Sequence, residues 1–428
     1  MASKINPIPP QSWVAIDVAK SMNVVLTEGS GGHQHRFRFS HCREDYERTA
    51  AFLRQLPGPC RIGLEPTADY HRTLAYYLIQ QGFEVVLVSS VAGARVREAT
   101  FNSWDKNDPK DAEVILRLLK MGMTQRFVDP VLARTHDLQE LSKTYHQVSR
   151  TKTRLQHVLV THYLTLYFPE LERFWSTQRN EWFIRFLLRF PTPHAVRSVD
   201  FPAFQQEVSA LMGRRVHKQA KIAEIYELAA HSIALPVGDD SPGVTTFRLQ
   251  LERYLQLCRA RAQLERQAED LLSGRADYQL LRTIPGVGPI TALIVLAEAG
   301  DLRRFSHHRQ FLKFCGLDLA KNQSGASRTR ERLSKRGNAR LRCALWQAAL
   351  TAARMRENAF SEKFRRYTAS APIDADLRRK ARTAVTAKMA RVVYALVKTN
   401  RPFHPRFELG LPSGSTPLRR AVEAFGTS

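Results

Sequence analysis

Four carboxylic acids in the first part of the chain have the residue types and spacing of a metal site. Asp17 lies within the apolar run VAIDVA, where an acid cannot be buried unpaired at low cost. Glu65 closes a second apolar run, CRIGLE. Asp108 and Asp111 stand three residues apart at the start of an amphipathic run, so both fall on one face of a helix whose N-terminus tolerates negative charge. Taken singly, such acids are usually solvated groups or, for Asp108, a helix cap.

Convergence of these four acids would give them a chemical role. Carboxylates brought together repel one another unless cations lie between them, and hard oxygen ligands suit Mg²⁺. Two Mg²⁺ ions about 3.5–4 Å apart promote in-line displacement at phosphorus. We therefore expect Mg²⁺, as two ions, to be the cofactor. The expected metal ligands and catalytic acids are Asp17, Glu65, Asp108 and Asp111.

The elements around these acids predict a mixed sheet. WVAIDVAK, NVVLTEG and HRFRFSH are typical of three consecutive strands, and a helical stretch, the strand CRIGLEP, the helix YHRTLAYYLIQQG and the strand FEVVLVS follow. Three strands followed by αβαβ is the element order of an RNase H-like (RuvC-like) fold. The first and fourth strands are neighbours in such a sheet, which would place Asp17 beside Glu65.

A second group of residues, in the last part of the chain, suggests phosphate binding. PGVGP at 285–289 separates two helical runs and predicts a helix-hairpin-helix, in which Gly286 and Gly288 let backbone N–H groups approach phosphate. The alternative is a structural turn. Ser324 precedes Gly325 in a polar loop, and composition alone does not separate it from an ordinary turn residue. A dense basic run then contains Arg328, Arg330, Arg332, Lys335, Arg336, Arg340 and Arg342.

Composition favours a nucleic-acid partner. The 428 residues include 65 Lys and Arg against 40 Asp and Glu, a formal net charge of +25, and such a surplus favours a polyanion because neutralised phosphates release counterions. No apolar stretch reaches the length of a membrane span, and the N-terminus lacks a signal peptide, so we expect no membrane partner and a cytoplasmic, nucleoid-associated location. Five scattered cysteines without a CxxC pair indicate reduced thiols.

The middle of the chain predicts long helices. An apolar seam with alternating spacings of three and four consists of Leu138, Leu141, Tyr145, Val148, Lys152, Leu155, Leu159 and His162. It fits a coiled coil or an intramolecular helical pair. Basic residues on this helix that could bind nucleic acid are Lys143, Arg150, Lys152 and Arg154. We expect an α/β nuclease domain over 1–125, a helical bridge with an insertion over 126–273, a basic helical domain over 274–399 and a loosely packed tail over 400–428.

Together these residues resemble the DEDD-type transposases of the IS110 and IS1111 insertion sequences, which are bridge-RNA-guided recombinases. The resemblance is clearest over 13–122 and 280–349, and the family's acids correspond to the four named above. Its second signature, K-x-G-N-x-x-L-R after a PGVGP hairpin and an S-G pair, includes Lys335, Asn338 and Arg342, which adds Asn338 to the expected nucleic-acid-binding residues. The chain departs from the family at Asn107, where a Thr is usual, and in PTADY after Glu65.

The resemblance implies a mechanism and partners. Ser324 would be the nucleophile that attacks the DNA backbone and forms a phosphoserine link. The partners would be double-stranded donor and target DNA, a guide RNA and further copies of the chain, as a dimer or tetramer. The acids and Ser324 would together form a composite site. Two alternatives remain from the residues: a Holliday-junction-resolving nuclease that uses water with the same acids, and a non-catalytic nucleic-acid-binding protein.

Overall fold

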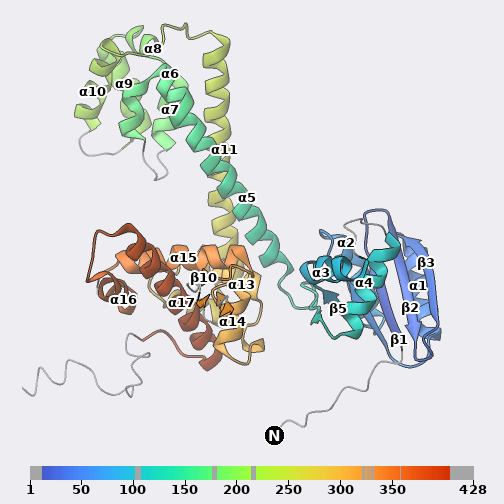
Figure 1. Ribbon diagram of the computed structural model, residues 1–428. Coiled ribbons are helices and arrows are strands. Elements are labelled where there is room, and N and C mark those ends of the chain that lie inside the picture. Colours follow the sequence, from blue (N-terminus) through green and yellow to red (C-terminus); the bar gives the residue numbers. More distant parts are fainter. Residues whose placement is uncertain are drawn as a thin grey trace, which may run out of the picture. The chain divides into compact units, whose positions relative to one another are not determined.

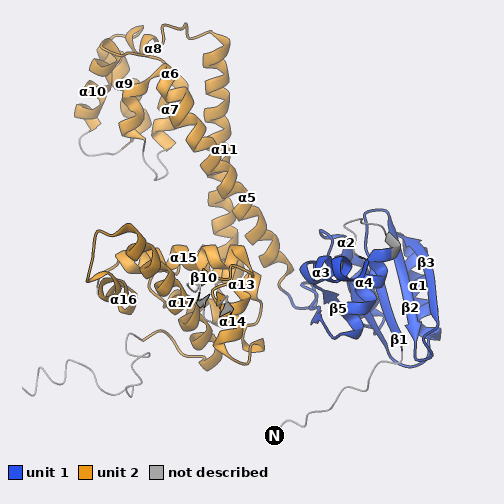
Figure 2. Ribbon diagram, in the orientation of Figure 1, with its two compact units in different colours: residues 1–134 blue, residues 135–428 orange. Residues whose placement is uncertain are grey.

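The computed structural model describes residues 12–101, 108–175, 181–213, 218–320, 323–324, 327–328, 332–356 and 358–404. The chain divides into two compact units, residues 1–134 and residues 135–428 (Figure 2). The first unit contains the sheet, and the second is almost entirely helical (Figure 1).

The sheet of the first unit has the order β3-β2-β1-β4-β5-β6. Its strands are β1 (Ser12–Asp17), β2 (Met22–Gly29), β3 (Gln34–Ser40), β4 (Cys60–Leu64), β5 (Glu84–Val88) and β6 (Thr124–Arg126). β1 pairs in parallel with β4, and β4 with β5, whereas the β1–β2, β2–β3 and β5–β6 pairs are antiparallel. This mixed α/β sheet fits the expected RNase H-like fold. The short edge strand β6 was not predicted.

Alternation along the strands supplies an apolar core to each face of the sheet. Val14 and Ile16 of β1 belong to the core formed with α1 (Arg43–Gln55) and α2 (Tyr70–Gln80). Ala15, which points the other way, belongs to the core formed with α4 (Asp108–Lys120), against which α3 (Ser90–Phe101) also packs. The sheet therefore lies between two helical layers.

Two long helices pair within the second unit: α5 (His136–Val158) and α11 (Pro242–Leu272). The Tyr145 hydroxyl donates to Glu265 at 3.2 Å, and the Tyr254 hydroxyl donates to Gln156 at 3.4 Å. Since the contacts advance along α5 while they retreat along α11, the two helices are antiparallel. The apolar seam of α5 thus has a partner in its own chain, and a coiled coil between chains stays a prediction.

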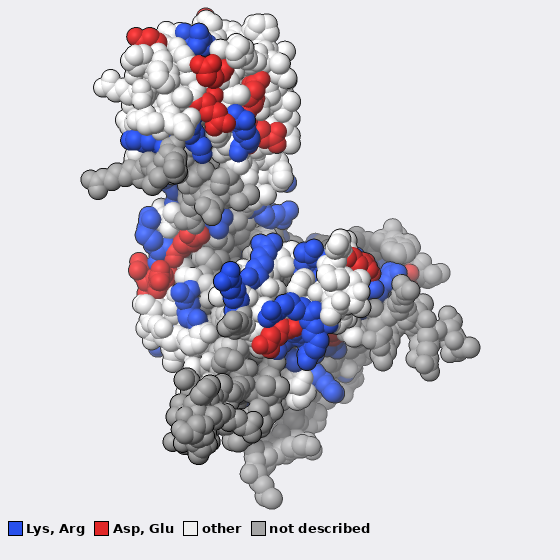
Figure 3. Space-filling model, turned by 90° about the vertical axis from the view of Figure 1, so that its left-hand side faces the viewer, with Lys and Arg blue, Asp and Glu red and all other residues white. Residues whose placement is uncertain are grey.

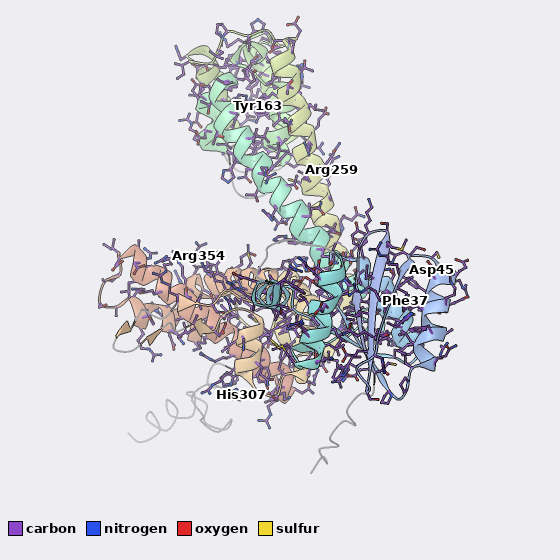
Figure 4. All side chains as sticks on the ribbon, turned by 45° about the vertical axis from the view of Figure 1, so that its right-hand side comes forward. Phe37, Asp45, Tyr163, Arg259, His307 and Arg354 are labelled. Carbon is purple, nitrogen blue, oxygen red and sulfur yellow. The ribbon has the colours of Figure 1, made fainter. Side chains whose placement is uncertain are left out.

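The seam does not extend to His162, which is exposed. A π-helix, η1 (Leu159–Leu164), follows α5 directly. Each π-turn takes up an extra residue, so the buried face shifts to Tyr163 and Leu164. The Tyr163 ring stacks on Phe247 of α11 with centroids 5.2 Å apart; Figure 4 labels Tyr163. The inclusion of His162 in the seam was wrong for this reason.

The second unit has two apolar cores. One, rich in phenylalanine, lies among α6 (Thr165–Tyr167), η2 (Pro169–Phe174), α7 (Glu181–Arg189), α8 (Pro193–Arg197), α9 (Phe201–Met212), α10 (Lys218–Ala230) and part of α11. The other lies among α12 (Ala276–Arg282), α13 (Pro289–Ala299), η3 (Leu302–Arg304), α14 (His308–Phe314), α15 (Ala339–Arg354), α16 (Ala359–Thr368) and α17 (Ala375–Thr399).

Two pairs of very short strands follow α14. β7 (Leu319–Ala320) pairs with β10 (Arg332–Leu333), and β8 (Gln323–Ser324) pairs with β9 (Ser327–Arg328). All five cysteines are free thiols, as expected. Within the described ranges, every helix is too short or too polar to cross a membrane.

Candidate active site and nucleic-acid interface

The sheet register brings Asp17 and Glu65 to the same edge. Ile16 of β1 lies opposite Leu64 of the parallel strand β4, and the two acids are the next residues along each strand. Because side chains alternate, Asp17 shares the face of Ala15 and Glu65 shares the face of Gly63, which is the face covered by α4. Both acids are partly buried.

Helix α4 carries Asp111 to this edge. Its last residue, Lys120, forms an ion pair with Glu28, which lies opposite Trp13 at the start of β1. α4 therefore runs antiparallel to β1, and its first turn lies toward the end of β1 that carries Asp17. Close packing holds the helix there, since a Cβ on Gly63 would lie only 3.2 Å from Cδ1 of Leu119.

Asp111 is buried against an arginine that the sequence analysis missed. Only 2% of its side chain is exposed, and its Oδ1 forms an ion pair with Nη2 of Arg97 on α3. This oxygen nevertheless accepts no hydrogen bond. One helical turn before Arg97, Gly93 lies beside Glu65, because a Cβ there would be 3.9 Å from Glu65 Oε2. Arg97 thus supplies positive charge beside Asp17, Glu65 and Asp111, a group that we call the acidic edge. The run ARVRE gives no sequence signal for this role.

The donor chemistry at this edge fits a hard cation. Oδ1 of Asp111, which is buried, pairs with Arg97 and accepts no hydrogen bond, is a carboxylate oxygen of the type that Mg²⁺ prefers. Among the side chains that the structure describes, no three His, Cys, Asp or Glu are grouped closely enough to hold a metal ion. The side chain of Asp108 lies outside the described residues, although the backbone of α4 begins there.

The region of the expected nucleophile belongs to the second unit. Ser324 lies at the end of β8, opposite Ser327 in the antiparallel pair with β9, which also contains Arg328. Their side chains and the whole of Arg330 lie outside the described residues. Arg332, Lys335 and Arg336, the basic residues that follow, are exposed and accessible to a phosphate backbone.

The turn between α12 and α13 has a packing reason for its first glycine. Gly286 has φ of +84°, and a Cβ there would lie 2.4 Å from the backbone oxygen of Ala348 on α15. The turn therefore packs against α15 at Gly286, which gives this glycine a packing reason beside the predicted approach to phosphate. Gly288, the N-cap of α13, has φ of −89° and no comparably close neighbour.

Two further residues expected to bind nucleic acid make structural hydrogen bonds. Asn338 accepts from the backbone N–H of Leu341 at 3.0 Å as the N-cap of α15, and it donates to Glu298 at 2.6 Å. Arg342 donates to the carbonyl oxygen of Cys315 at 3.0 Å. The Glu298 side chain is only 4% exposed and also pairs with Arg340 at 2.8 Å. An acid within the apolar run LIVLAEA is the same signal as Asp17 and could have identified Glu298 from the sequence.

Among the basic residues expected on the long helix, Lys152 was assigned wrongly. It is only 7% exposed, and its Nζ lies 4.8 Å from the centroid of the Tyr254 ring, so its charge faces α11 and not a ligand. Arg150 and Arg154 are exposed, and half-buried Lys143 forms an ion pair with Glu140 at 3.1 Å. Figure 3 shows further Lys and Arg side chains on one face, with acids among them.

Comparison with known proteins identifies the family. A DEDD transposase family of IS110 elements matches residues 14–169, and the family described as "Transposase IS116/IS110/IS902 family" matches residues 278–365. A "Probable family 20 transposase" of Pseudomonas aeruginosa is 26% identical over 400 residues, which cover 92% of this chain and 99% of that relative. The transposase of insertion sequence element IS1328 of Yersinia enterocolitica is 27% identical over 80% of this chain and 84% of its own. The chain belongs to the IS110 family of DEDD transposases.

Proposed function

We propose that this transposase cleaves and exchanges the DNA strands of an insertion sequence by Mg²⁺-dependent phosphoryl transfer, with Ser324 as the nucleophile. The observation that carries the metal-site part of the proposal is the buried Oδ1 of Asp111, which pairs with Arg97 but accepts no hydrogen bond, near the ends of the strands that carry Asp17 and Glu65. The serine half rests on the family's S-G signature before a basic run.

The chemistry balances without an external energy source. Mg²⁺ held by Asp17, Glu65, Asp108 and Asp111 would polarise the scissile phosphate and favour ionisation of the attacking hydroxyl. Oγ of Ser324 forms a bond to phosphorus and loses its proton to solvent, while one P–O bond to deoxyribose breaks and the departing oxygen gains a proton. The phosphoserine conserves the ester bond, so a hydroxyl of the second DNA strand can then displace Ser324.

The metal half is tested by cleavage of DNA that contains the ends of the element. Asp17→Ala and Glu65→Ala should each lower the rate of Mg²⁺-dependent nicking by at least about 100-fold, because each change removes a ligand from the proposed site. Glu113→Ala is the matched control: this acid lies on α4 but pairs with Arg117 and is 34% exposed. Wild-type nicking rates in Asp17→Ala, with folding verified by circular dichroism, would refute the site.

We further propose that an RNA selects the DNA sites by base pairing while the protein grips nucleic-acid backbones. The net charge of +25 is ample for this, and the sequence contains no zinc finger or homeodomain-like segment. Strand exchange by nuclease-treated protein should require RNA transcribed from the non-coding end of the element. Efficient site-specific exchange by RNA-free protein would contradict the guided mechanism and indicate direct DNA recognition.

A further inference from the structure

A large cavity opens on the first unit and has no part in the chemistry above. Its volume is about 1040 Å³, and it lies outside the group of acids. Its lining includes the tyrosines Tyr46, Tyr70, Tyr76 and Tyr77 and the basic residues Lys20 and Arg43. Ligand pockets for small molecules commonly measure roughly 300–1,000 Å³, so this cavity has room for more than one nucleotide.

The cavity lies at the same edge of the sheet as Asp17 and Glu65. Lys20 stands in the loop that leaves β1 just after Asp17, and Ala68 stands in the loop that leaves β4 just after Glu65. Since β1 and β4 are parallel neighbours, both loops emerge on one side. The acids face α4, whereas Tyr46 and Tyr77 of the cavity pack on the opposite face of the sheet with α1 and α2. A strand whose phosphate lies at the acids would pass over the ends of β1 and β4 to bring its adjoining nucleotides to this cavity.

Two of the tyrosines are held by neighbouring side chains, and the other two are exposed. The rings of Tyr46 and Tyr77 lie 5.4 Å apart, and His41 fixes Tyr46 through a 2.7 Å hydrogen bond to its hydroxyl. The other ring nitrogen of His41 is 2.8 Å from the carbonyl oxygen of Ala19 in the β1–β2 loop. Tyr70 and Tyr76 on α2 are instead 40% and 37% exposed, so their rings remain available to a ligand.

Charge at the rim suits a phosphate backbone. Lys20 and Arg43 are exposed cations, although Arg43 also pairs with Glu47 at 2.9 Å. The one acid of the lining, Asp69, has the guanidinium of Arg72 4.0 Å away. Exposed aromatic rings beside cations are the combination that binds single-stranded nucleic acid, because each unpaired base offers a face for stacking. A duplex keeps its base faces covered.

We propose that this cavity binds unpaired nucleotides of a nucleic-acid strand, with bases on Tyr70 and Tyr76 and phosphates near Lys20 and Arg43. The inference rests on the proposed function only in that the acids act on an adjoining phosphate. Unpaired DNA and unpaired RNA both offer bases for stacking and phosphates for the cations.

Photocrosslinking of the full-length protein tests the proposal without any need for catalysis. Single strands that carry 5-iododeoxyuridine or 5-iodouridine are irradiated with the protein in EDTA, and crosslinked peptides are mapped by mass spectrometry. Crosslinks should map to Tyr70 and Tyr76 with the DNA strand, the RNA strand or both, which also identifies the source. A blunt duplex with an internal 5-iododeoxyuridine should give none there. The absence of α2 crosslinks with both single strands would overturn the proposal.

Affinity measurements on variants supply a second readout. Fluorescence anisotropy with labelled oligo(dT) and oligo(U) should show binding about tenfold weaker for the Tyr70→Ala, Tyr76→Ala double variant, and near wild-type binding for the double Phe variant, which keeps both rings. Tyr367→Ala on α16, which is 45% exposed, is the matched control. Unchanged affinity in the double Ala variant would also overturn the proposal. Nicking and covalent attachment by Ser324 are assayed separately, so failure of the cavity and failure of the proposed function are distinguishable.

Discussion

Arg97 and Asp111 form a buried ion pair at the acidic edge, with 15% and 2% of their side chains exposed. A buried carboxylate without a counter-charge is costly, and the guanidinium meets that need in the absence of a metal. Mg²⁺ at the same carboxylate would also supply a positive counter-charge. We therefore expect the stability of the first unit to depend more on Mg²⁺ when Arg97 is removed.

Replacement of Arg97 by Ala should lower the free energy of unfolding in EDTA by about 3–5 kcal/mol, because it leaves Asp111 buried and unpaired. Added Mg²⁺ should recover part of this loss, so the Tm of Arg97→Ala should rise with Mg²⁺ more than the Tm of the wild type. Urea unfolding followed by circular dichroism measures both effects. Arg95→Ala, which removes a 78% exposed arginine, should change stability by no more than about 0.5 kcal/mol. Equal losses with and without Mg²⁺ would show that Asp111 does not bind the metal.

His71 gives the first unit a dependence on pH. It is buried against Phe127, its Nδ1 has no hydrogen-bond partner, and burial lowers the pKa of its imidazole. The unfolded chain therefore binds a proton more readily than the folded unit, so the stability that neutral His71 contributes is present above about pH 6.5 and is lost as the pH falls below it. Between pH 7.5 and 5, His71→Leu should lose less stability than the wild type. Parallel losses in the two proteins would rule out this role for His71.

At the scale of elements, short runs rich in Val, Ile and Phe, bounded by glycines and polar residues, predicted β1 to β5. β6 has three residues, Thr124–Arg126, too few for a periodic signal. The π-helix after α5 was equally hidden, since LVTHYL continues an ordinary helical pattern. The π-helix turns Tyr163 toward Phe247, and this stacking contact joins parts of the chain that are distant in sequence.

The glycines of the turn before α13 separate packing from phosphate binding. Gly286→Ala should destabilise the second unit by roughly 2 kcal/mol or more, since it combines a positive φ with a clash against Ala348. Gly288→Ala should be nearly neutral in stability. Thermal unfolding and DNA binding are measured for both variants. A Gly286→Ala protein of normal stability but weakened DNA affinity would contradict the packing explanation and support phosphate binding at this turn.

At the scale of the whole molecule, the sequence predicted the positions of Asp17 and Glu65 better than the groups around them. Asp17 and Glu65 could be paired because strand order fixes which residues share a sheet edge. Arg97 could not, since its partner is set by how α3 packs on α4. Basic residues were the least predictable: Lys152 and Arg154 stand on one helix, yet only Arg154 is exposed.

Salt dependence of DNA binding distinguishes these surfaces. The logarithm of the DNA-binding constant falls linearly with the logarithm of the salt concentration. Replacement of the exposed Arg150 and Arg154 by Ala should make this slope shallower, by about 0.7–0.9 for each phosphate that the variant no longer neutralises. Lys152→Met, which removes a buried charge from the same helix, should leave the slope unchanged. A reduced slope in Lys152→Met alone would mean that the α5–α11 pair opens on nucleic acid.

Trapping of a covalent protein–DNA adduct tests the central claim most directly. Labelled DNA with the ends of the element is incubated with protein, Mg²⁺ and RNA, denatured and resolved by gel, and the attached peptide is identified. The wild type and Ser327→Ala should give an adduct at Ser324, whereas Ser324→Ala and Asp17→Ala should give none. An adduct that persists in Ser324→Ala, or nicked DNA from the wild type with no attached protein, would contradict the account; the second result would indicate a nuclease that uses water.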